Sequence, residues 1–339
     1  MGKIFAAGLL LCGLLAQAGC AQAPVSQLIP TSSQVTTSES TRSATLTASA
    51  TLPADPPTPE PSDTIIPILT STITPTPTPR EVRFAVIGDY GSGDEAEQRV
   101  ADLVLSWNPD LVLTVGDNNY PLGEVATIDD HIGRFYHGFI YPYTGSYGAG
   151  ADTNRFFPAL GNHDLYSEQG KAYFDYFVLP GNERYYEFVW GPVHFFCLNS
   201  TDSEPDGVGR SSVQAAWLQE RMAASTSNWQ VVYFHLPPYS SGYQGSVDWM
   251  RWPFAAWGAE VVLTGHDHLY ERLEVDGIPY VINGLGGGAI YPFVETRSES
   301  RVRYNASHGA MLVTAGEGSM VFQFFADSGQ LVDQFELQR

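Results

Sequence analysis

The chain has 339 residues and a formal net charge of −20 at pH 7, nearly all of it carried by residues 81–339. So acidic a chain argues against nucleic-acid polymers and anionic membrane surfaces as electrostatic partners. Only one of its three cysteines, Cys197, lies beyond residue 20, which excludes a disulfide or a cysteine zinc site in that part of the chain.

The N-terminus has the pattern of an export signal. Lys3 precedes an apolar run over residues 4–16 that is too short to span a bilayer, and two small residues precede Cys20. This ending is similar to a bacterial lipobox, in which the cysteine becomes the lipidated first residue. We expect residues 1–20 to be a lipoprotein-type signal peptide and the protein to be exported and lipid-anchored at the bacterial cell surface. The alternative is an ordinary cleaved signal and a secreted protein.

The rest of the chain divides into two parts by composition. Residues 21–80 are mostly Ser, Thr, Pro and Ala, and we expect a disordered linker because so few apolar groups cannot offset the entropy of ordering. Residues 81–339 hold almost every aromatic side chain and are numerous enough to bury a substantial core. We expect them to form one catalytic domain.

Apolar periodicity predicts an α/β domain. Strands are expected at 82–88, 110–116 and 156–161, and helices at 94–107, 169–177 and 211–225. Further strands are expected at 185–190, 193–199, 230–235, 261–264, 273–275, 280–283, 311–315, 320–325 and 332–337. Strands that first alternate with helices and then follow one another indicate two packed sheets with flanking helices.

Five segments place a polar residue directly after an apolar strand, often beside a glycine. They are VIGDYG (86–91), TVGDNNY (114–120), ALGNHD (159–164), VVYFHLPPYSSG (231–242) and VVLTGHDHLYER (262–272). Loops beyond the carboxyl ends of strands in an α/β sheet converge on one edge, where ligands bind. We therefore expect the polar residues of these five loops to meet.

The five loops deliver a set of oxygen and imidazole donors. The set is Asp89, Asp117, Tyr120, Asn162, His163, His235, His266 and His268. Such a mixture suits zinc, manganese or iron, and its size suits two metal ions that share a carboxylate, an arrangement that hydrolyses phosphate esters. Each residue alone has a structural reading, as a turn, a core histidine or a strand residue. The five segments together, each at a strand end, favour the metal site.

The order and the residues of these segments resemble the calcineurin-like metallophosphoesterase superfamily over residues 82–339. Within it, GDNNY (116–120) and GHDHLYER (265–272) look like the motifs of purple acid phosphatases of the tartrate-resistant type. The resemblance implies a four-layer αββα sandwich of two mixed sheets. It also implies ferric iron paired with a divalent ion (Fe, Zn or Mn), and hydrolysis of a small phosphate monoester by in-line attack of a metal-bound hydroxide.

The resemblance also implies a role for each residue. Ferric iron would take Asp89, Asp117, Tyr120 and His268, and the divalent ion would take the bridging Asp117 with Asn162, His235 and His266. His163 would stay free of metal and would hydrogen-bond the phosphate or protonate the leaving group. Two departures stand out: Tyr90 occupies a position where many relatives have Trp, and the stretch SSGYQGS (240–246) lacks the further histidines of plant-type members.

Other segments carry weaker expectations. The aromatic interval 121–155 is expected either to shape the substrate cleft, with His137, Tyr143 and Tyr147 near the substrate, or to be an ordinary surface excursion. Asp164 is expected to orient its neighbours rather than to bind metal.

Two alternative functions stay open. One is a phosphodiesterase acting on nucleotides or cyclic nucleotides, and the other is a catalytically silent surface-binding lipoprotein. The sequence makes no prediction of oligomeric state.

Overall fold

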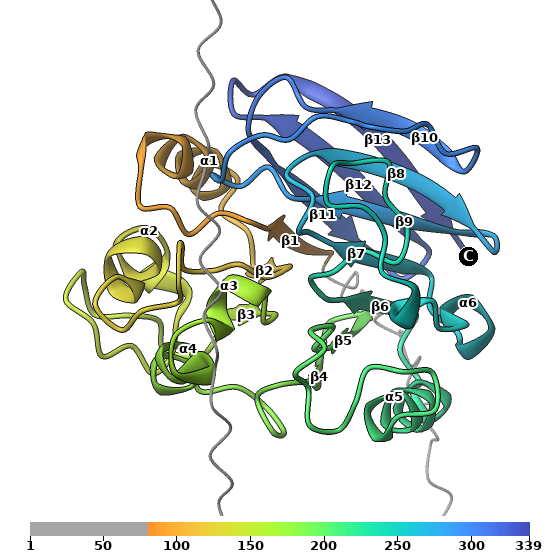
Figure 1. Ribbon diagram of the computed structural model, residues 1–339, viewed down its shortest axis with the longest axis horizontal. Coiled ribbons are helices and arrows are strands. Elements are labelled where there is room, and N and C mark those ends of the chain that lie inside the picture. Colours follow the sequence, from red (N-terminus) through yellow and green to blue (C-terminus); the bar gives the residue numbers. More distant parts are fainter. Residues whose placement is uncertain (1–80) are drawn as a thin grey trace, which may run out of the picture. The chain divides into compact units, whose positions relative to one another are not determined.

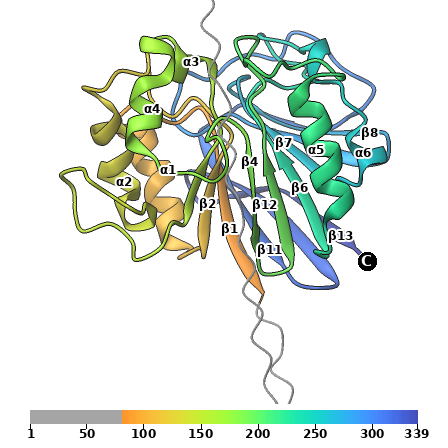
Figure 2. The ribbon, with the colours of Figure 1, turned by 90° about the horizontal axis from the view of Figure 1, so that it is seen from below.

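The computed structural model describes residues 81–339, so the predicted signal peptide, Cys20 and the predicted linker lie outside the described residues. The described chain forms two mixed β-sheets that pack face to face, with helices on their outer sides (Figures 1 and 2). No helix within residues 81–339 is long and apolar enough to cross a membrane.

The first sheet has six strands in the order β13-β12-β11-β1-β2-β3. Its strands are β1 (Val82–Ile87), β2 (Leu111–Thr114), β3 (Phe156–Pro158), β11 (Gly309–Ala315), β12 (Ser319–Ala326) and β13 (Leu331–Gln338). The pairs β1–β2 and β2–β3 are parallel, whereas the C-terminal strands are antiparallel to their neighbours. The N-terminal half of the domain therefore supplies the parallel part of this sheet.

The second sheet has seven strands in the order β10-β8-β9-β7-β6-β5-β4. Its strands are β4 (Tyr186–Trp190), β5 (Val193–Cys197), β6 (Trp229–Tyr233), β7 (Val261–Thr264), β8 (Tyr270–Val275), β9 (Ile278–Asn283) and β10 (Ser300–Tyr304). The central strands β5, β6, β7 and β9 are parallel, and the flanking strands are antiparallel.

Helices cover the outer faces of both sheets, as Figure 2 shows. On the first sheet's side lie α1 (Glu95–Ser106), the helical turns η1 (Asp129–Gly133), α2 (Arg134–Tyr136) and η2 (His137–Phe139), then α3 (Asn162–Leu165), η3 (Glu168–Gly170) and α4 (Lys171–Tyr176). On the second sheet's side lie α5 (Val213–Ala224), η4 (Asp248–Met250) and α6 (Phe254–Trp257). Helix α1 begins at Asp94, whose side chain accepts hydrogen bonds from the amides of Ala96 and Glu97.

The central strands are buried on both faces, which explains their continuous apolar runs. In β6 the side chains of Val231 and Tyr233 belong to the core between the sheets. Val232 and the adjoining Phe234 pack in the second cluster, together with Leu218 of α5. This alternation follows from the two-residue period of a strand and produces the predicted four-layer arrangement of helix, sheet, sheet and helix.

Several parts of the chain differ from the sequence-based expectation, among them the short helical segments η1, α2, η2 and α6, which were not predicted. Strand β10 was not predicted, because it is a half-buried edge strand with the sequence SRVRY and has no continuous apolar run. The predicted third strand ends early, at Pro158, because the chain turns there and α3 begins at Asn162.

Candidate metal centre

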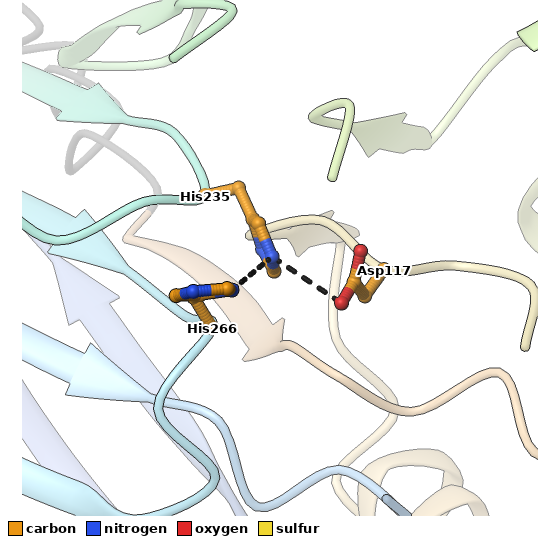
Figure 3. Close-up of side chains that lie close together, drawn as sticks. All are labelled: Asp117, His235 and His266. Carbon is orange, nitrogen blue, oxygen red and sulfur yellow. Dashed lines mark hydrogen bonds and ion pairs between the residues drawn. The ribbon is translucent and has the colours of Figure 1, made fainter. Parts of the chain in front are cut away.

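The five polar loops follow β1, β2, β3, β6 and β7, each of which has at least one parallel partner. Parallel strands end at the same edge of a sheet, so their loops gather there. Figure 3 shows Asp117, which follows β2 of the first sheet, facing His235 and His266 of the second sheet. The site therefore lies where the edges of the two sheets meet.

Three of the predicted metal ligands have an unusual backbone conformation. Asp89, Asp117 and His266 have positive φ angles of 56°, 54° and 70°. Residues other than glycine rarely adopt this region, and such strain concentrates at functional sites. This backbone conformation turns the three side chains toward the shared centre.

A glycine allows one of the carboxylates to be approached closely. A Cβ atom at Gly161 would lie only 2.1 Å from Oδ1 of Asp117 and 2.2 Å from its backbone nitrogen. The loop after β3 can therefore pack against the loop after β2 only if this position has no side chain.

The first donor group consists of Asp117, His235 and His266. Nε2 of His235 lies 3.3 Å from Oδ2 of Asp117 and 3.3 Å from Nδ1 of His266 (Figure 3). Nδ1 of His235 lies 2.8 Å from the carbonyl oxygen of Val115, so Nε2 is the nitrogen left for the centre. Oδ1 of Asn162 lies 3.1 Å from the same Nε2, which adds a fourth donor.

The second donor group consists of Asp89, Asp117 and His268. Nε2 of His268 lies 3.3 Å from Oδ1 of Asp89, and its Nδ1 lies 2.6 Å from the carbonyl oxygen of Ala289. The hydroxyl of Tyr120 lies 3.0 Å from Nε2 of His268 and donates to Oδ2 of Asp117 at 3.1 Å. Tyr120 therefore completes this group.

The donor set fits two metal ions. In each group the ligand atoms all lie within 4.8 Å of one another, and Asp117 belongs to both groups. Asp89, Asp117 and His235 are almost completely buried, and buried carboxylates are costly unless cations balance them. Oxygen and imidazole donors without thiolate suit iron, zinc or manganese.

Asp117 and His235 stabilise each other's charges within the buried site. Burial opposes ionisation of Asp117, but the charge of His235 holds the pKa of this carboxyl below its usual range. Burial likewise opposes the charge on His235, but Asp117 raises its pKa to about 9. Burial and the charge on His235 lower the pKa of His266 to about 4. A metal ion would displace the proton on His235, because ligation requires a neutral imidazole.

Asp164 supports the loops that carry the ligands, as predicted. Its Oδ1 accepts a hydrogen bond from the Asn118 amide nitrogen at 3.0 Å. Its Oδ2 accepts from Nδ2 of Asn118 at 2.7 Å and from the Gly161 amide at 2.8 Å. Oδ1 of Asn118 in turn accepts from the buried Tyr90 hydroxyl at 3.1 Å. Asp164 thus ties together the loops after β2 and β3.

His163 lies beside the donors without joining either group. Its Nδ1 lies 2.6 Å from the carbonyl oxygen of Pro121, and its ring packs between Tyr120 and Tyr166 with centroid separations of 4.6 Å and 4.9 Å. The Tyr166 hydroxyl accepts a hydrogen bond from Nδ2 of Asn162 at 2.8 Å, which turns the Asn162 oxygen toward His235.

The three residues expected near the substrate lie in a separate cluster. The hydroxyls of Tyr143 and Tyr147 each donate to a carboxylate at 2.6 Å, that of Asp129 and that of Asp130 respectively. Nδ1 of His137 lies 2.9 Å from the Gly133 carbonyl oxygen. None of the three belongs to the lining of the cleft at the metal centre. The two tyrosines thus anchor the surface excursion of residues 129–147 to its own acidic residues, and His137 contacts its backbone.

An open cleft of about 290 Å³ lies over the second donor group. Its lining contains residues that sequence reasoning missed as site residues, above all Asp94 and Tyr291. From the sequence, Asp94 is expected only to begin a helix, and Tyr291 lies within the Gly-rich segment 284–292, for which we expect only a tight turn near the site. Position in the chain is the only sequence signal for these two residues. Asp94 lies just after the first motif (86–91), and Tyr291 lies in the loop after β9, the strand that pairs with β7.

Comparison with known proteins gives a consistent result. The family model described as calcineurin-like phosphoesterase matches residues 82–270. Mouse (Mus musculus) tartrate-resistant acid phosphatase type 5 is 26% identical over 258 residues, which cover 65% of this chain and 76% of the mouse protein. Purple acid phosphatase 15 of Arabidopsis thaliana is 27% identical over 249 residues, covering 60% of this chain and 45% of that protein.

The fold agrees with these matches. The purple acid phosphatase PPD1 of yellow lupin (Lupinus luteus) superposes with a TM-score of 0.61 at 18% identity, covering 77% of this chain and 54% of that chain. This chain thus spans about half the length of the plant proteins it matches. The family model covers more than half of the chain, the strand topology places its motifs at one edge, and the donor groups stand where the motifs predict them. The chain therefore belongs to the calcineurin-like phosphoesterase family, and it is similar in sequence and fold to purple and tartrate-resistant acid phosphatases.

Proposed function

We propose that the chain is an exported phosphatase that hydrolyses small phosphate monoesters with two metal ions. The observation that carries this proposal is the pair of donor groups that share Asp117. Two adjacent cations bridged by one carboxylate are suited to displacement at phosphorus. The preference for monoesters is transferred from the acid phosphatases to which the chain is similar.

Each donor group is assigned one ion. Ferric iron would be held by Asp89, Asp117, Tyr120 and His268, and a divalent ion by Asp117, Asn162, His235 and His266. When bound, the two ions polarise the phosphoryl group, acidify water for in-line attack and stabilise the charge of the transition state.

The protein's own residues position the substrate and manage protons. His163 lines the cleft, and its Nδ1 is committed to the Pro121 carbonyl, so Nε2 is the nitrogen available to the substrate. From there it can hydrogen-bond a phosphoryl oxygen or protonate the departing alcohol. The rings of Tyr120 and Tyr166 restrict its rotation and keep it in place.

Metal analysis together with an ester panel tests the proposal. The full chain should contain two metal ions and should turn over p-nitrophenyl phosphate faster than bis-p-nitrophenyl phosphate. Faster turnover of the diester would make it a phosphodiesterase, and turnover of neither ester by the metal-loaded protein would leave the silent binding protein. Asp117→Asn should lose both metals, whereas Asp175→Asn, an exposed residue paired with Lys171, should keep them.

Export and anchoring need a separate test, because Cys20 lies outside the described residues. We expect radiolabelled fatty acid to be incorporated into the wild-type protein in a bacterial host and not into Cys20→Ala. A protein that is released to the medium without label would be secreted through an ordinary signal.

A further inference from the structure

The cleft beside the predicted iron ligands has walls of distinctive chemistry. Its lining is Ser92, Asp94, Tyr120, His163, His268, Gly287, Gly288, Ala289 and Tyr291. Tyr120, His163 and His268 belong to the catalytic centre. The loop before α1 supplies Ser92 and Asp94, and the loop after β9 supplies residues 287–291. A substrate whose phosphate meets the metals can place its alcohol portion against these two loops.

The two loops are packed together, so the walls are well defined. The amide of Gly288 donates to the Asp89 carbonyl oxygen at 2.8 Å. A Cβ atom at Gly287 would lie 3.1 Å from Oγ of Ser92, which places the glycine run directly against the loop before α1.

Asp94 gives this part of the cleft a fixed negative charge. Its Oδ1 accepts hydrogen bonds from the Ala96 amide at 2.8 Å and the Glu97 amide at 3.2 Å, which anchor the side chain at the start of α1. Partial burial works against ionisation, but hydrogen bonds, led by the one from the Glu97 amide, lower the pKa of Asp94. The carboxylate is therefore charged at neutral pH.

Two arginines of the neighbouring helices α1 and α2 have other partners and do not line the cleft. Arg99 donates to Asp327 at 2.9 Å and to the Glu95 carbonyl oxygen. Arg134 lies over the Phe135 ring and approaches only the Gly93 carbonyl oxygen, at 3.5 Å. None of the described residues that line the cleft is a lysine or an arginine.

Tyr291 adds an aromatic surface to the same cleft. Its ring stacks on the His268 imidazole at a centroid separation of 4.1 Å and an interplanar angle of 7°. Tyr243, whose side chain is 65% exposed, meets Tyr291 edge-on at 5.9 Å. A carboxylate and an aromatic ring in one pocket are the two groups that attract an organic cation, through charge and through the quadrupole of the ring.

We propose that the cleft selects phosphate monoesters whose alcohol carries a positive charge, such as esters of amino alcohols or quaternary ammonium alcohols, with Asp94 and Tyr291 as the specificity-determining residues. The selection rests on the phosphatase function proposed above. The expected preference in kcat/KM comes from one exposed charge pair and one cation–π contact. Together these two interactions favour the cationic ester by roughly three- to tenfold.

A matched pair of substrates isolates the effect of charge. Phosphocholine and 3,3-dimethylbutyl phosphate have nearly the same shape and differ in a quaternary nitrogen in place of a carbon. With the metal-loaded full chain, kcat/KM should be roughly three- to tenfold higher for phosphocholine. The ratio should fall as ionic strength rises, because salt screens the Asp94 charge.

Two variants and one control test whether Asp94 and Tyr291 cause the preference for the cationic ester. Asp94→Asn removes the charge but retains a side chain that caps helices well, so the ratio should fall part of the way toward one without loss of folding. Tyr291→Leu should lower the ratio independently. Asp102→Asn, on the exposed side of the same helix, should leave the ratio unchanged.

The outcomes separate this inference from the proposed function. A wild-type ratio of one or less, with p-nitrophenyl phosphate still hydrolysed, overturns the inference and leaves the phosphatase intact. A wild-type preference that survives in both Asp94→Asn and Tyr291→Leu overturns the assignment to these residues. Absence of turnover of every ester refutes the phosphatase proposal and this inference with it.

Discussion

Asp164 is the residue whose substitution best tests how the site is built. Its carboxylate accepts three hydrogen bonds in a buried position, one at Oδ1 and two at Oδ2. In Asp164→Asn one oxygen becomes an NH2 group that faces a donor. If the remaining oxygen takes the place of Oδ2, one hydrogen bond is lost, and in the opposite orientation two are lost.

The expected loss of stability follows from this count. Each buried donor left without an acceptor costs about 1–3 kcal/mol. Burial and the nearby Asp117 raise the pKa of Asp164 to about 7, so the neutral amide also relieves some repulsion and offsets part of the loss. We expect a net decrease of about 1–3 kcal/mol in the free energy of unfolding, or roughly 3–10 °C in Tm for a domain of this size.

Thermal unfolding of the metal-free protein, followed by circular dichroism, measures the effect without a contribution from metal loss. The matched control is Asp175→Asn, which changes an exposed residue and should shift Tm by about 1 °C or less. A Tm for Asp164→Asn equal to or above that of the wild type would show that charge repulsion outweighs the hydrogen bonds, and the reasoning would be refuted.

Three further substitutions test separate features. Gly161→Ala should abolish metal retention and activity because its Cβ would lie 2.1 Å from Oδ1 of Asp117, whereas Gly138→Ala, with no heavy atom within 4 Å, should keep both in elemental and ester assays. Tyr120→Phe should remove the visible phenolate-to-iron absorption of the oxidised protein, and persistence of that colour would contradict the ligand assignment. Burial raises the pKa of Glu97 well above its usual value, so its contribution to stability is complete below the pKa of the unfolded carboxyl, about 4.3, and is lost as pH rises above it. Glu97→Gln should therefore stabilise the protein at pH 7 but not at pH 4 in denaturant titrations, and equal effects at both would count against a buried neutral carboxyl.

The ligand loops could be predicted from the sequence because their signal is local. A short apolar strand followed by a polar residue and often a glycine is visible in a few consecutive letters, as at Asp89 and Asp117. The shared edge then follows from the parallel topology. Asp164 could be assigned a supporting role for the same reason, since it lies two residues beyond Asn162.

The pairing of the two cleft walls could not be predicted because it depends on contacts between distant segments. Asp94 and Tyr291 are separated by almost 200 residues, and only the packing of the glycine run against the loop before α1 brings them into one pocket. Tyr143 and Tyr147 follow the second motif in sequence, but their hydroxyls pair with Asp129 and Asp130. Such pairings leave no trace in residue spacing.

The donors come from both halves of the sandwich: the carboxylates Asp89 and Asp117 follow strands of the first sheet, and the imidazoles His235 and His266 follow strands of the second. Metal ions bound by residues from both sheets would cross-link the sheets. Tight metal binding would therefore also oppose separation of the two sheets. Each tenfold excess of free metal over its dissociation constant then adds about 1.4 kcal/mol to the folded state. The ions proposed to perform the chemistry would thereby also raise the thermal stability of the fold.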